Sequence, residues 1–167
     1  ITPYISNISI DYNYLNDGCS CDRILVKSNL KDSLIDLSGK SREIILKNDL
    51  LDKPVMYWCL DRPIDKAPVK LFIDVEKRVT KDNPSLLWEY YAKDKNGKYV
   101  WKNIEIMDLT DNFSHSAVST IIGKNNFAQT TIFGKTGYFI RIVNHDEKYS
   151  TTEDVESHPM INGIHFN

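Results

Sequence analysis

Apolar and polar residues alternate along much of this chain, and the alternation predicts β-strands. The clearest case is VKLFIDVE, residues 69–76, where aliphatic residues occupy every second position and charged residues most of the others. A period of two places one set on a core and the other in water. Similar strands are predicted at residues 8–14, 23–28, 42–47, 54–60, 86–92, 98–109, 117–122, 138–144 and 160–166.

The segment LLWEYYAKDKNGKYVWKN, residues 86–103, sets two tryptophans on either side of an Asn-Gly pair. Asn-Gly is typical of a tight β-hairpin. Trp88 shares strand parity with Tyr90 and Ala92, so we expect it to face the core. We expect Trp101 to pack across the hairpin against the same cluster. The alternative is that both indoles form an exposed platform for a sugar.

The remaining segments add one helix to this pattern. Leu30, Leu34 and Leu37 recur at helical spacing in residues 29–38, which predicts one short helix. The whole chain therefore predicts a single all-β domain over residues 1–167, an antiparallel, jelly-roll-like β-sandwich with at most one or two short helices. Because it begins at Ile1 rather than Met, we expect a fragment excised from a longer protein.

Composition narrows the classes of partner. The 21 basic and 23 acidic residues are dispersed and leave a formal charge of −2, so no basic stripe is present to bind nucleic acid. No apolar run approaches the roughly 20 residues that cross a bilayer, so no membrane role is expected. Cys19, Cys21 and Cys59 are odd in number, which argues against a disulfide framework, and their role stays open.

Candidate chemistry is sparse. His145 and Asp146 lie in a polar loop, where solvated side chains are expected rather than acid-base catalysis. The loop DLTDN, residues 108–112, lacks the glycine and terminal glutamate of a calcium loop, so we expect a turn stabilised by side-chain hydrogen bonds. The sequence therefore predicts no catalytic residue, no cofactor and no metal, and the protein is not expected to be an enzyme.

Arg141 is the remaining charged candidate. It lies in YFIRIVN, residues 138–144, a strand whose other residues are mostly apolar. Two interpretations stay open: a buried arginine with a charged partner, because unpaired burial is costly, or an arginine that faces outward.

Several short motifs follow one another in a recognisable order. They are MYWCLDRP (56–63), FIDVE (72–76), WEY (88–90) with Trp101, DLTDNFSHS (108–116) and YFIR (138–141). In this combination residues 55–167 resemble the baseplate assembly (baseplate J-like) family of contractile phage tails and related injection systems. Two departures are Ala117, where the pattern has glycine, and Phe127, where tryptophan is common.

The resemblance implies a structural role. Its members are components of the baseplate wedge, so the expected partners are other wedge, tube or sheath subunits. The expected location is the baseplate of a virion or phage-tail-like particle assembled in the bacterial cytoplasm. Trp88, Trp101 and Arg141 are the candidate interface or ligand residues. The alternative function is a carbohydrate-binding β-sandwich that takes part in host attachment.

Overall fold

The computed structural model describes residues 21–27, 32–36, 43–44, 55–76, 85–123, 125–145 and 160–166. For the ranges before residue 45 and for Met160, only the backbone is described. Every regular element within these ranges is a β-strand, and the strands form two antiparallel sheets. The described part of the chain has no helix that is long and apolar enough to cross a membrane.

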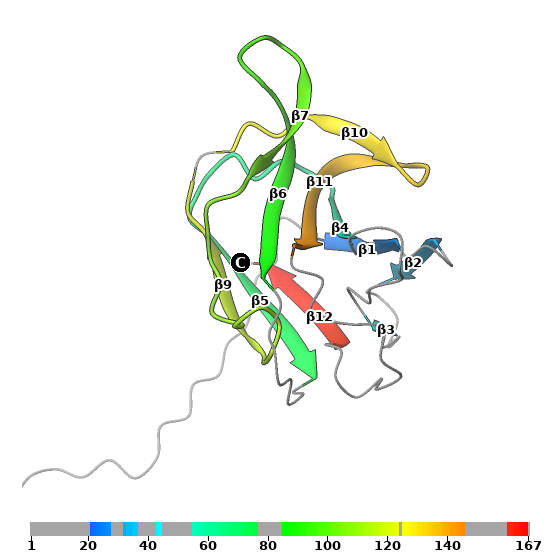
Figure 1. Ribbon diagram of the computed structural model, residues 1–167, viewed down its shortest axis with the longest axis vertical. Helices are drawn as coiled ribbons and strands as arrows, with labels where there is room; N and C mark the ends of the chain where they lie inside the picture. Colours follow the sequence, from blue (N-terminus) through cyan, green and yellow to red (C-terminus); the bar gives the residue numbers. More distant parts are fainter. Residues whose placement is uncertain are drawn as a thin grey trace, which may run out of the picture.

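The larger sheet carries most of the residues that matter below. Its strands are, in spatial order, β2 (Asp32–Asp36), β1 (Cys21–Lys27), β4 (Val55–Leu60), β11 (Lys135–Asn144), β6 (Leu86–Lys93) and β7 (Tyr99–Asn103), with β10 (Gln129–Ile132) paired to β11. Figure 1 shows the β6–β7 hairpin projecting above the body of the sandwich, while the β10–β11 hairpin bends away to one side.

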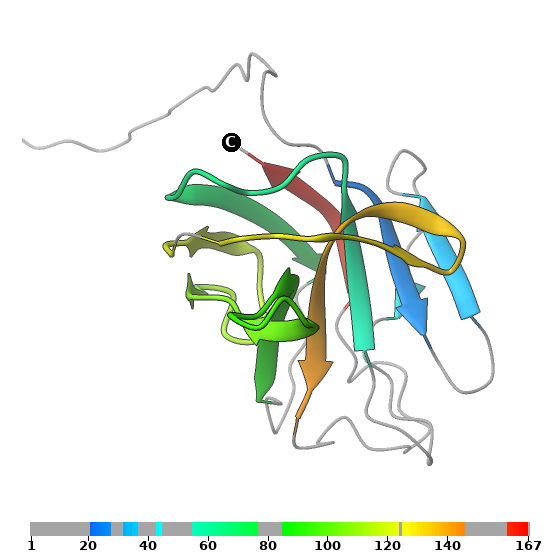
Figure 2. The same cartoon turned by 90° about the horizontal axis from the view of Figure 1, so that it is seen from above.

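The smaller sheet packs against one face of the larger one. Its strands are, in spatial order, β3 (Glu43–Ile44), β12 (Met160–Phe166), β5 (Val69–Glu76), β9 (Ala117–Ile121) and β8 (Ile106–Met107). Figure 2 shows β11, β4, β1 and β2 succeeding one another across the larger sheet. The chain changes sheet between β4 and β5, so sequence neighbours lie on facing layers.

The core lies between the two sheets and follows the period of two. On β5, Leu71, Ile73 and Val75 are buried, while Phe72 on the other face is exposed. On β4, Met56 and its alternate neighbours are buried in the same way. The prediction of an antiparallel β-sandwich is confirmed.

Two predictions of local structure need correction. The helix predicted at residues 29–38 is wrong over 32–36, which form β2 and pair with β1 from Lys27↔Asp32 to Arg23↔Asp36. Backbone pairing with a neighbouring strand outweighs a weak helical spacing, which is a common tertiary override. Strand β10 was not predicted, and the strand expected at 98–109 is divided into β7 and β8. The strand predicted at residues 8–14 lies outside the described residues.

Candidate functional site

The two tryptophans of the β6–β7 hairpin lie on opposite faces of the larger sheet. Trp88 is buried in the core, where its ring packs against Trp58 and Phe113 at centroid distances of 5.1 and 5.6 Å. Trp101 is half-buried on the outer face and pairs across the hairpin with Tyr91. The prediction is therefore confirmed for Trp88 and wrong for Trp101.

The turn between the two strands explains the difference. Residues 95–97 form a three-residue loop closed by Asp94 and Lys98, in which the Asp94 N–H donates to the Lys98 carbonyl at 2.8 Å. The Gly97 N–H donates to the Asp94 carbonyl at 3.1 Å, and Gly97 has a φ of 79°. This is the arrangement of a type I turn followed by a left-handed residue, for which glycine is the usual choice.

Loop length decides which side chains share a face. A two-residue turn centred on Asn96-Gly97 would place Trp101 opposite Ala92, on the face of Trp88. The observed register instead pairs Ala92 with Val100. A shift of one residue moves every side chain of a strand to the other face of its sheet.

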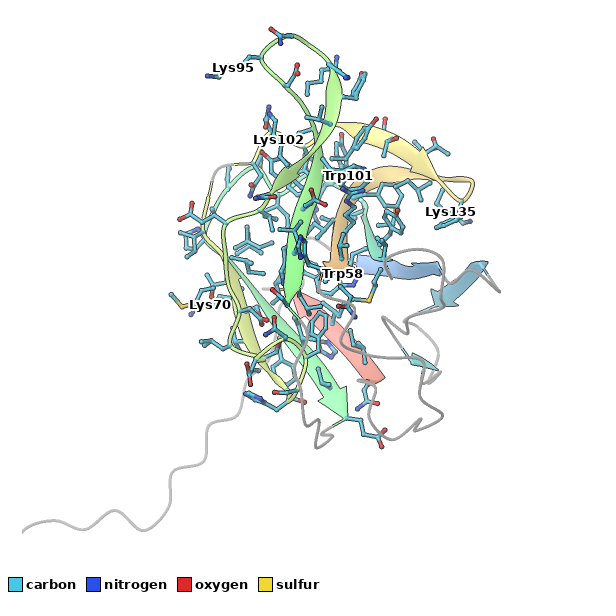
Figure 3. All side chains as sticks on the ribbon, viewed as in Figure 1. Trp58, Lys70, Lys95, Trp101, Lys102 and Lys135 are labelled. Atoms are coloured by element: carbon cyan, nitrogen blue, oxygen red, sulfur yellow. The ribbon has the colours of Figure 1, made fainter. Side chains whose placement is uncertain are left out.

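Trp101 belongs to a cluster on the outer face that we call the outer aromatic patch, and that consists of Tyr57, Tyr91, Tyr99, Trp101 and Phe133. The Trp101 ring lies 5.2 Å from Tyr91 and 5.9 Å from Tyr57, and the two contacts are tilted by 66° and 52°. Tyr99 stacks on Tyr91 at 5.7 Å. Figure 3 shows Trp101 close to where the β6–β7 and β10–β11 hairpins meet.

Phe133 extends the patch onto the tip of the β10–β11 hairpin. It occupies the first position of a two-residue turn with Gly134, and the two residues have φ values of 47° and 73°. Asn or Asp is the usual residue at such a position, because a bulky side chain is strained there. The Phe133 ring packs edge-on against Tyr57 at 5.9 Å and is 41% exposed. An aromatic ring is thus held at the margin of the patch despite an unfavourable backbone.

Arg141 lies in the same layer and has two partners. Its Nε donates to the Glu89 carboxylate, which lies directly opposite on β6, and its guanidinium stands 4.4 Å from the centre of the Trp101 ring. The Arg141 side chain is 26% exposed and that of Glu89 is 10% exposed. Of the two interpretations left open by the sequence, the structure supports an arginine with a charged partner, half-buried on the outer face.

The ion pair between Arg141 and Glu89 is expected to contribute to the free energy of unfolding. We expect Arg141→Met to destabilise the domain by about 2 kcal/mol, because it leaves a largely buried carboxylate without its cation. A double-mutant cycle with Glu89→Gln should give a coupling energy of about 1 kcal/mol, since part of the pair is open to solvent. Urea unfolding of the unsubstituted domain, the two single variants and the double variant measures this coupling energy. Additive losses would mean that the two side chains do not stabilise each other.

The DLTDN loop is a turn organised by Asp108. Its Oδ1 accepts hydrogen bonds from the Thr110 N–H and hydroxyl, at 2.9 and 2.7 Å, and from the Ser119 hydroxyl at 2.7 Å. Its Oδ2 accepts from the Asn112 N–H at 3.2 Å. The prediction of a turn stabilised by side-chain hydrogen bonds is confirmed.

This turn has an unusual backbone. Asp111, Asn112 and Phe113 have φ values of 50°, 55° and 66°, in the left-handed region that costs a non-glycine residue roughly 1–2 kcal/mol. Phe113 is fully buried, and its N–H donates to the Thr110 hydroxyl at 3.0 Å. The hydrogen bonds of Asp108 and the burial of Phe113 thus offset the strain.

The other candidates do not converge on a site. His145 is exposed after β11, and Asp146 lies outside the described residues. Cys59 lies on β4 beside Gly137, whereas Cys19 and the side chain of Cys21 are not described. Among the residues that the structure describes, no group of three or more His, Cys, Asp or Glu side chains is arranged to hold a metal ion.

Sequence reasoning found Trp101 and Arg141 but not the rest of the patch. Tyr57 and Tyr91 could have been found by parity, because each alternates with residues that the pattern assigns to the core. Phe133 could not, because its contact with Tyr57 depends on how β11 pairs with β4.

Neither a family model nor a curated protein matches the sequence.

Proposed function

We propose that this domain is a structural component of the baseplate of a contractile phage tail or phage-tail-like injection system, and that it acts through protein-protein contacts without catalysis. The order of sequence motifs over residues 55–167 supports the family resemblance. In the folded domain several motif residues contact one another, among them Asp74 with Ser116, Glu89 with Arg141, and Trp88 with Phe113. The motifs therefore maintain the fold, as expected of a scaffold.

The observation that carries the proposal is the outer aromatic patch. Tyrosine, tryptophan and arginine are the residues that most often dominate binding energy at protein interfaces. Here Tyr99 is 49% exposed and Phe133 is 41% exposed, at opposite margins of a cluster that also includes Trp101 and Arg141. Exposed apolar patches that polar residues surround often mark sites of interaction with another protein.

Carbohydrate binding is the second candidate, and the same patch supports it in part. Aromatic rings beside a charged pair such as Arg141–Glu89 are the kind of groups that bind sugars. A sugar, however, stacks on an open ring face. One face of the Trp101 ring is covered by the Arg141 guanidinium, and the contacts of Tyr57 with Trp101 and Phe133 are tilted by 52° and 77°. Such interlocked rings suit a protein surface better than a flat pyranose.

Deletion of the coding sequence for residues 1–167 is expected to abolish assembly of contractile particles. A scaffold holds neighbouring subunits in register, so its loss should leave tubes or partial baseplates rather than complete particles. Electron microscopy of particles purified from the producing bacterium measures this outcome. As a control, complementation with the intact gene should restore particles. Normal particles from the deletion strain would contradict the proposal.

A further inference from the structure

The β6–β7 hairpin that borders the outer aromatic patch is strongly basic. It carries four lysines between residues 93 and 102, and a single carboxylate, Asp94, whereas the whole chain has a formal charge of −2. Lys93, Lys95 and Lys98 are exposed. Figure 3 shows Lys95 at the tip of the projecting hairpin and Lys102 near its base. Positive charge is therefore concentrated on one projecting element of an otherwise slightly acidic chain.

The one carboxylate of the hairpin is engaged in the turn. Asp94 Oδ1 accepts hydrogen bonds from the backbone N–H groups of Asn96 and Lys98, both at 2.8 Å. These bonds fix the loop, so the hairpin presents its lysines from a preformed backbone. Preorganisation lowers the entropy lost when a partner binds.

The lysines and the aromatic rings form one continuous surface. The Lys93 ammonium stands 4.8 Å from the centre of the Tyr99 ring, and Tyr99 stacks on Tyr91, which contacts Trp101. Arg141 is already paired with Glu89, so the hairpin lysines supply the charge that a ligand would meet. A complementary partner carries carboxylates beside apolar side chains.

We propose that the hairpin lysines and the outer aromatic patch together bind an acidic segment of a neighbouring protein subunit. The inference rests on the proposed function and adds the chemistry of the partner. Complementary charge steers association and selects the partner, while the aromatic rings provide the buried anchors. Nucleic acids and acidic sugars fit less well, because both stack on open ring faces. The Trp101 ring is tilted against Tyr57 and Tyr91, and the Tyr99 ring is stacked on Tyr91 with the Lys93 ammonium over it.

Photo-crosslinking in assembled particles tests whether the acidic segment binds at the outer aromatic patch. A photoreactive phenylalanine analogue replaces Tyr99, which is 49% exposed, and in a matched control it replaces Phe72, which is 37% exposed on the outer face of the smaller sheet. We expect position 99 to crosslink to a segment rich in Asp and Glu from another subunit. A basic or neutral segment there, or crosslinks from position 72 alone, would overturn the inference. Complete particles into which the domain is not incorporated would instead refute the proposed function.

Charge reversal tests the role of the lysines. Lys95→Glu with Lys98→Glu is expected to reduce the crosslink yield at position 99 by about tenfold at low salt, and by less at high salt, because these charges are exposed and screened. Lys70→Glu, an exposed lysine on β5, is the control and should leave the yield unchanged. Soluble poly-glutamate should compete for the site more strongly than an anionic oligosaccharide of equal charge. Equal yields from all variants, or stronger competition by the oligosaccharide, would overturn the proposal.

Discussion

Trp88→Ala is expected to lower the free energy of unfolding by about 3–5 kcal/mol, whereas Trp101→Ala is expected to lower it by about 1–2 kcal/mol. Trp88 is 5% exposed and packs between Trp58 and Phe113, so its removal leaves a cavity between the sheets. The Trp101→Ala variant loses the contact with Arg141 and two tilted ring contacts, all at a surface that water can reach. Urea unfolding followed by far-ultraviolet circular dichroism measures both losses.

The milder variants Trp88→Phe and Trp101→Phe provide the same comparison if Trp88→Ala does not fold. We expect the same order of losses in this pair, because a smaller ring still leaves unfilled volume only at the buried position. Equal losses at Trp88 and Trp101 would contradict the assignment of the two indoles to opposite faces of the sheet.

Asp108→Ala is expected to destabilise the domain by about 3–4 kcal/mol. The substitution removes the acceptor for the hydroxyls of Thr110 and Ser119, both fully buried, and releases a turn whose backbone is strained. Asp108→Asn keeps one acceptor oxygen, so its expected loss is smaller, about 1–2 kcal/mol. Thermal and urea unfolding of the two variants check the order.

Asp65→Ala provides the matched control, because Asp65 is exposed in the loop after β4 and its loss should change stability by no more than about 0.5 kcal/mol. An excess of Ca²⁺ should not raise the melting temperature of the unsubstituted domain, since protein donors already occupy the Asp108 carboxylate. A clear rise that Asp108→Ala abolishes would restore the calcium interpretation of the loop.

The alternation of apolar and polar residues correctly predicted the core-facing side chains wherever one face of a strand is buried. VKLFIDVE is strand β5 with the predicted bounds, and Leu71, Ile73 and Val75 are all in the core. The parity of Trp88 was likewise sufficient to predict its burial. Both inferences depend only on the direction of successive side chains within one strand, which is a local property.

Inferences about partners across strands were less secure. Leu34 lies in β2 rather than in a helix, because that segment pairs with β1. Arg141 and Glu89 are 52 residues apart in sequence, so their pairing follows from the placement of β11 beside β6. No spacing rule within a single strand could have joined these two side chains.

The sequence alone thus determined the β class of the domain, most of its strands and the residues of each strand that face the core, because these follow from a period of two. Tertiary structure decided which face Trp101 occupies, because a three-residue loop sets the register of β7. It also decided that Trp101, Phe133 and Arg141 meet in one patch. Their contacts depend on the order of strands in the sheet, which long-range backbone pairing fixes and local periodicity does not encode.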